Sequence, residues 1–180
     1  MRRLNSPLAA TAALVLLPLA ASVDAVPSGL ASLPHPHFPK TLICELPQGP
    51  KITVRHLTVT FDAAGAAKMD AGEAWHLAGA TFETDSDLVV GGKAVQAGMY
   101  ALSARKASKG WTLTLHDGKG FSRPGDDAIV LETDFRSGGV LFEHLNCDVQ
   151  PGGDKRSTRL FLDVRFDKML ARCAIDLPKK

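Results

Sequence analysis

Short β-patterned segments recur along most of this chain, and their spacing is the feature that most constrains its fold. They return at intervals of roughly 8 to 15 residues, with turns rich in Gly, Pro and Asp between them. In "WTLTLH", Trp111, Leu113 and Leu115 alternate with polar residues, the pattern of a strand with one buried face. This succession predicts an all-β fold, an antiparallel β-sandwich that is either jelly-roll-like or an open barrel. We expect Trp111 in its core.

The stretch from Asp62 to Gly79 departs from the β pattern. Its alanines favour a helix, but Gly65, Gly72 and Gly79 each disfavour one by about 1 kcal/mol. We therefore expect a long Ala/Gly loop that contains one helical turn.

The glycine-rich stretch "VVGGKAVQAGMYALSA" has the chemistry of hairpin turns. Gly91 and Gly92 can adopt the positive φ angles of a tight turn, and Gly98 serves a second turn before the next strand. A phosphate-binding glycine loop should open a helix, whereas this one opens a strand. The stretch thus predicts turns and no phosphate site.

In two of the predicted strands, the sequence indicates which face carries the apolar side chains. In "KITVRHLTVTF" the apolar residues change face near Arg55–His56, which indicates a bulge or a register change. In "VLFEHLNCDV", alternation places Leu141, Leu145, Cys147 and Val149 on one face.

The C-terminal segments 140–149, 159–166 and 169–176 read as three consecutive antiparallel strands. In such a meander, Cys147 and Cys173 lie two strand spacings apart, about 9–10 Å. A disulfide needs Cα atoms within about 7 Å, so this pair is disfavoured. If a bridge forms, Cys44 is one partner, with either Cys147 or Cys173. The alternative is that all three thiols stay reduced and pack in the core.

The N-terminus has the order of a secretory signal peptide. Basic Arg2 and Arg3 precede an apolar stretch of 15 residues, and small residues follow it at Val23 and Ala25. The apolar stretch is short for a membrane span, which needs about 20 residues. We expect residues 1–25 to be a signal peptide, 26–40 an extended Pro-rich lead-in, and 41–178 a single β-domain. We thus expect an exported protein, periplasmic or extracellular, with no transmembrane segment after signal cleavage.

The charge balance argues against nucleic acid as a partner. Cleavage after Ala25 would remove Arg2, Arg3 and Asp24 from 21 basic and 19 acidic residues, leaving a net charge of +1. The densest basic cluster, "GGDKRSTR", has no aromatic residues among its charges, so it reads as a solvated turn. Composition leaves the ligand or protein partner undefined.

The segment "GGKAVQAGMYAL" and the "WTLTL" that follows it resemble the secreted bacterial family catalogued as domain of unknown function twenty-nine-eleven. The segment order from about Gly49 to Leu177 also fits this family. One departure is that His76 stands where the family's Trp-Arg-x-Gly-Ala-Asn motif has arginine, and no asparagine follows Gly79–Ala80. The resemblance implies a secreted β-rich fold and no particular activity. The matching residues are Gly91, Gly92, Val95, Ala97, Gly98, Tyr100, Leu102, Trp111 and Thr112.

Histidines offer the main candidates for a metal site. His35 and His37 form "HPH" and would bind copper or zinc if a histidine of the domain supplied a third ligand. His116 and His144 fall opposite the leucines of their strands, so we expect both to reach solvent or a loop. His56 and His76 are the other two histidines of the domain.

The remaining polar groups give no catalytic signature. The acidic stretch "ETDSD" (residues 83–87) could hold calcium only if a loop folded around it, because it lacks the glycine and distal glutamate of an EF-hand. No GxSxG or HExxH motif is present. Four serines lie in turns or at strand ends with no recognisable triad around them, namely Ser103, Ser108, Ser122 and Ser137.

These observations assign no catalytic, cofactor-binding or metal-binding residue. They favour an exported, non-catalytic β-sandwich module with a ligand-binding, partner-binding or structural role. Two alternatives stay open: a metal-binding protein or metalloenzyme that uses His35, His37 and a domain histidine, and a hydrolase whose site is assembled only in the fold.

Overall fold

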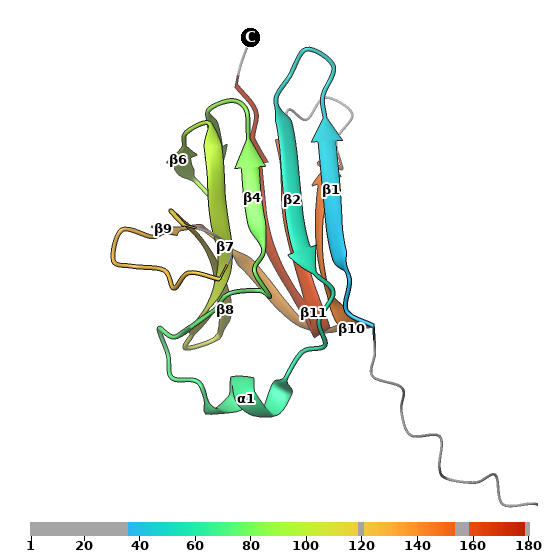
Figure 1. Ribbon diagram of the computed structural model, residues 1–180, viewed down its shortest axis with the longest axis vertical. Helices are drawn as coiled ribbons and strands as arrows, with labels where there is room; N and C mark the ends of the chain where they lie inside the picture. Colours follow the sequence, from blue (N-terminus) through green and yellow to red (C-terminus); the bar gives the residue numbers. More distant parts are fainter. Residues whose placement is uncertain (1–35, 119–120, 154–158, 179–180) are drawn as a thin grey trace, which may run out of the picture. The chain divides into compact units, whose positions relative to one another are not determined.

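The computed structural model describes residues 36–118, 121–153 and 159–178. These residues form two antiparallel β-sheets that do not close into a barrel, and the one helix among them is short (Figure 1). The all-β sandwich predicted from the sequence is therefore confirmed. No helix in the described ranges is long and apolar enough to cross a membrane. The predicted signal peptide, and the lead-in as far as His35, lie outside the described residues.

The larger sheet has seven strands, in the order β1-β2-β4-β7-β8-β9, and β3 pairs with β7 beside this path. β1 begins two residues before the predicted domain start, because a proline is tolerated as the first residue of a strand. The bounds are β1 (Pro39–Glu45), β2 (Lys51–Leu57), β3 (Ala74–Trp75), β4 (Thr81–Thr84), β7 (Gly98–Ala107), β8 (Gly110–His116) and β9 (Ile129–Val130).

The smaller sheet has the order β10-β11-β5-β6. Its tight β5–β6 hairpin turns through Gly91 and Gly92, at φ angles of 51° and 70°, as the sequence predicts. The bounds are β5 (Leu88–Val90), β6 (Lys93–Val95), β10 (Asp134–Pro151) and β11 (Arg159–Asp176).

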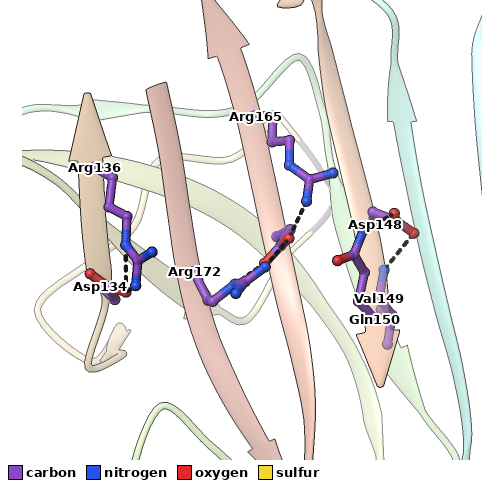
Figure 2. A network of polar contacts seen from close by, with 8 residues as sticks. Asp134, Arg136, Asp148, Val149, Gln150, Arg165 and Arg172 are labelled. Carbon is purple, nitrogen blue, oxygen red and sulfur yellow. Dashed lines mark hydrogen bonds and ion pairs between the residues drawn. The ribbon is translucent and has the colours of Figure 1, made fainter. Parts of the chain in front are cut away.

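Strand β11 doubles back on itself at Asp167, whose φ is 51°. A straight strand of its 18 residues would separate Arg159 from Asp176 by about 55 Å, yet their side chains pair at 2.6 Å. In Figure 2, Arg165 and Arg172 lie on neighbouring runs of chain for the same reason. Because residues 146–151 of β10 pair with the first half of β11, these runs form the predicted three-strand meander.

The core lies between the inward faces of the two sheets. Trp111 of β8 is 6% exposed there, which confirms its predicted place. Its ring meets Trp75, Phe61 and Phe166 at centroid distances of 6.0 to 6.5 Å, mostly edge to face.

Two phase predictions were wrong. The apolar phase of β2 does not switch at Arg55–His56: Ile52, Val54 and His56 are all buried, and β2 ends only at Leu57. Leu141 does not share the buried face of Leu145, because the register of β10 shifts between Phe142 and Asn146, and Leu141 is 52% exposed.

All three cysteines are free thiols, the reduced alternative left open by the sequence. Burial raises the pKa of Cys147 to about 12 and that of Cys173 to about 11, and it also raises the pKa of Cys44. The thiols are thus protonated at neutral pH, and the two buried ones, Cys147 and Cys173, are unreactive.

The Ala/Gly stretch forms a six-residue helix, α1 (Ala63–Lys68), within a longer loop, much as expected. The Asp62 carboxylate accepts a hydrogen bond from the Gly65 N–H at the helix start. At its other end, the Lys106 ammonium donates to the carbonyls of Ala66, Ala67 and Met69. Lys106 of β7 therefore ties α1 to the larger sheet.

The outward face of the smaller sheet carries an ionic network (Figure 2). Asp163 is fully buried, and its carboxylate accepts hydrogen bonds from Arg172 at 2.6 and 2.7 Å and from Arg165 at 2.5 Å. The two guanidiniums cover it and stack on Phe161 and Phe142. One buried carboxylate thus joins the two halves of β11.

Replacing Asp163 by Asn should lower the free energy of unfolding by about 3 kcal/mol, because two largely covered arginines lose their shared anion. The matched control is Asp134→Asn, whose ion pair with Arg136 is half exposed and should contribute less than about 1 kcal/mol. Urea denaturation followed by tryptophan fluorescence measures both. Equal, small losses would contradict this role of Asp163.

Candidate functional site

The outward face of the larger sheet is polar where β4, β7 and β8 lie side by side. On β7, Leu102 and Ala104 face the core, so Ser103 and Arg105 face outward. Ser103 is in register with Thr114 of β8, and Ala101 with His116. Alternation along the strands thus gathers these polar groups on one face.

A loop after β8 covers part of this polar face. The Phe121 ring of this loop packs directly against Gly79. A Cβ added to this glycine would lie 2.6 Å from the ring. Beneath the cover, Ser103 and Thr114 are fully buried and His116 is 3% exposed. Of the two predicted surroundings of His116, solvent or a loop, the structure thus has the loop. Its Nε2 lies 3.0 Å from Ser103 Oγ, and its Nδ1 lies 3.2 Å from the Asp117 carbonyl oxygen.

A cavity of about 310 Å³ opens beside the covered groups, and we call it the sheet-face cavity. Glu73 and His76 flank β3, Arg105 comes from β7, and Arg123 comes from the covering loop. β3 pairs with β7 at Ala74 and Arg105, which fixes the distance between these walls. The full lining is Met69, Gly72, Glu73, Ala74, His76, Arg105, Arg123 and Pro124.

The two arginines of this cavity differ from all other arginines in the described ranges. There are seven, and five of them form ion pairs with Asp or Glu. Arg105 and Arg123 form none with any described residue, although Glu73 lines the same cavity. The Glu73 carboxylate instead accepts a hydrogen bond from the Asp70 N–H at 2.6 Å. The cavity therefore holds two guanidiniums that lack a protein anion among the described residues.

Buried polar atoms without a hydrogen-bond partner gather in the same region. Six such side-chain atoms occur among the described residues, and five belong to this face or its covering loop. Native proteins satisfy most buried polar atoms with protein or water, so this concentration indicates a place for water or a ligand. The five are His76 Nδ1, Thr81 Oγ1, Arg105 Nε, Thr114 Oγ1 and Ser122 Oγ.

Sequence reasoning singled out His76, through the altered family motif, but missed both arginines. Arg105 stands in "SARKA" and Arg123 in "FSRPG", and no spacing links the two. The alternation of β7 was the only feature of the sequence that pointed to Arg105, because it places this residue on the outward face with Ser103.

The other sequence candidates do not assemble into a site. In the acidic stretch, Glu83 pairs with Arg55, Asp85 accepts from the Lys51 N–H and Asp87 accepts from the Ala97 N–H. Each carboxylate thus has its own structural partner, and the described part of the chain has no calcium-like cluster.

For the proposed metal site, the His37 ring lies 6.3 Å from that of His144, and its Nδ1 bonds the Thr58 carbonyl at 2.6 Å. His35 lies outside the described residues. No group of three or more metal-ligating side chains forms among the described ones.

His56 lies in the core at the edge of the sandwich. Its Nε2 accepts a hydrogen bond from the Cys147 N–H of the facing sheet, and its Nδ1 has no partner in the described ranges. Burial lowers the pKa of His56 to about 4, and the positive charge of Lys40 adds to this effect. The imidazole is thus neutral and joins the two sheets.

Comparisons with known proteins add no family. No family model, curated protein or solved structure matches the chain. The resemblance based on the Gly-Gly hairpin motif therefore stays a prediction.

The titration of His56 generates a pH test. Its pKa is 6.5 when unfolded and about 4 when folded, so its contribution to stability is complete above pH 6.5 and is lost as the pH falls toward 4. Between pH 7 and pH 4 the wild type should lose about 3 kcal/mol more than His56→Gln. Val54→Ala lies on the same strand and removes no titratable group. Its free energy of unfolding should therefore change with pH as that of the wild type does. Denaturation at several pH values measures these free energies of unfolding. If they changed equally with pH in the wild type and in His56→Gln, the lowered pKa of His56 would be contradicted.

Proposed function

We propose that this protein is an exported, non-catalytic β-sandwich module that binds a small anionic ligand in the sheet-face cavity. Support for export is the basic, apolar and small-residue order of residues 1–25. Support for binding comes from the cavity and its side chains.

The observation that carries this proposal is the pairing state of the arginines. Five described arginines have carboxylate partners, and the two without one line the same cavity. A guanidinium presents a rigid fork of donors that fits a carboxylate or a phosphate with two parallel hydrogen bonds. Two such forks at one cavity favour an anionic ligand.

The buried polar atoms nearby favour the same ligand chemistry. Arg105 Nε is covered and has no partner among the described residues, so an acceptor placed there would satisfy it. His76 Nδ1 is in the same condition and lines the same cavity. An anion would thus replace water at several groups at once, which makes its binding geometrically selective.

Titration of the protein with acetate and with inorganic phosphate, followed by NMR, tests this function. We expect saturable binding that weakens about tenfold or more in Arg105→Gln and Arg123→Gln, because each loses a charged hydrogen bond. Arg55→Gln is the matched control: Arg55 belongs to the same sheet but pairs with Glu83, and this variant should bind like the wild type. Binding of neither anion, or equal binding by all variants, would overturn the proposal.

A hydrolase is the second candidate, and one contact favours it. Ser103 Oγ lies 3.0 Å from His116 Nε2, within reach for a base to take the hydroxyl proton, and the Asp117 carbonyl lies 3.2 Å from the other ring nitrogen. Ser103 is fully buried, however, so a substrate has no access to its hydroxyl in this conformation. For this reason we prefer the binding module to the hydrolase.

Labelling with a serine-reactive fluorophosphonate separates the two candidates. The binding module predicts no modification of Ser103 detectable by peptide mass spectrometry. Stoichiometric modification at Ser103, lost in His116→Gln, would instead support the hydrolase.

A further inference from the structure

A second cavity, of about 280 Å³, lies on the core side of β3, under α1. Phe61, Trp75 and Trp111 line it, with Ala66 and Met69 contributed by α1 and the residue after it. We call it the aromatic cavity. Its lining is mainly apolar, as in sites that bind the hydrophobic part of small molecules.

The aromatic cavity adjoins the sheet-face cavity. Met69 lines both. Ala74 and Trp75 are neighbours on β3, and each lines one of the two cavities because successive side chains of a strand point to opposite faces. The cavities therefore meet at Met69, beside the two-residue strand β3.

Local charge decides which apolar ligand fits. The Lys106 ammonium is bound to the carbonyls of Ala66 and Met69, both of which line the aromatic cavity. Asp62, the acidic residue of the lining, accepts a hydrogen bond from the Gly65 N–H. The only charged side chain in the described lining is thus the Asp62 carboxylate, which opposes a second anion here and leaves room for an uncharged hydrocarbon or aromatic group.

We propose that the two cavities form one site for an amphiphilic anion. Its carboxylate or phosphate head lies between Arg105 and Arg123, and its uncharged apolar tail lies against Trp75, Trp111 and Phe61. Met69 separates the two parts, and its unbranched thioether can change rotamer to admit the tail. This inference rests on the proposed anion binding and adds the class of ligand.

Titration with acetate, butanoate, hexanoate and octanoate tests the inference. If the tail enters the aromatic cavity, affinity should rise about fourfold for each added methylene. Trp75 and Trp111 are the two tryptophans of the chain and both line the aromatic cavity, so the intrinsic tryptophan fluorescence reports on its occupation. It should change with hexanoate and octanoate and stay constant with acetate. Alkyl phosphates of the same lengths distinguish a phosphate head from a carboxylate head.

Ala66→Asp supplies the matching variant, since Ala66 lines the aromatic cavity but not the sheet-face cavity. It should bind acetate like the wild type but lose the gain in affinity with chain length. Met99→Asp is its control, because Met99 is half exposed on the same sheet and lines neither cavity.

The outcomes separate this inference from the proposed function. Arginine-dependent acetate binding whose affinity is independent of chain length would overturn the amphiphile site and leave the anion site standing. Chain-length dependence that survives both Arg105→Gln and Ala66→Asp would place the tail elsewhere and overturn the inference. Failure of every anion to bind would overturn both.

Discussion

The pairing of β7 is the interaction on which the rest of the structure depends. This strand is hydrogen-bonded to β8 along one edge and to both β3 and β4 along the other. Its inward side chains fill the core, and its outward ones, Ser103 and Arg105, form the polar face. Lys106, at its end, holds α1 by three carbonyls. The sheet-face cavity takes Arg105 from β7 itself, and the aromatic cavity takes Trp75 and Trp111 from the strands β3 and β8 that pair with it, so backbone hydrogen bonds to β7 position residues of both.

Burial of polar groups on an outward face opposes stability unless those groups find partners. On the smaller sheet, partners within the described chain offset the lost solvation of these groups, because Asp163 binds Arg165 and Arg172. The larger sheet differs: five buried polar atoms of this face and its covering loop, Arg105 Nε among them, have no partner among the described residues. Such a difference between two faces of one domain is typical of a binding site, where the missing partner comes from outside.

Much of the fold was predictable because its cause is local. Period-two alternation predicted the sandwich and the burial of Trp111, and paired glycines predicted the β5–β6 turn. The turn at Asp167 followed from a break between two alternating runs. These features depend on residues that are close together in the chain, so they can be predicted from one sequence.

The errors and omissions have a different origin. For His116 the sequence left solvent and a loop open, because alternation says which face a residue takes and not whether a loop covers that face. Leu141 was misplaced, because extra residues in β10 shift its register between Phe142 and Asn146. Arg105 and Arg123 were missed, because what distinguishes them is the absence of a carboxylate partner within the described fold. That property depends on contacts between remote segments.

The most direct measurement of the central claim is the NMR signal of the Arg105 Nε–H group. This atom is buried and unpartnered in the described chain, so an anion in the sheet-face cavity should bind it directly. The account predicts that added acetate or phosphate shifts this resonance saturably, while the Nε–H signal of Arg55 stays in place. An unmoved Arg105 signal, or equal shifts at both arginines, would contradict a specific anion site.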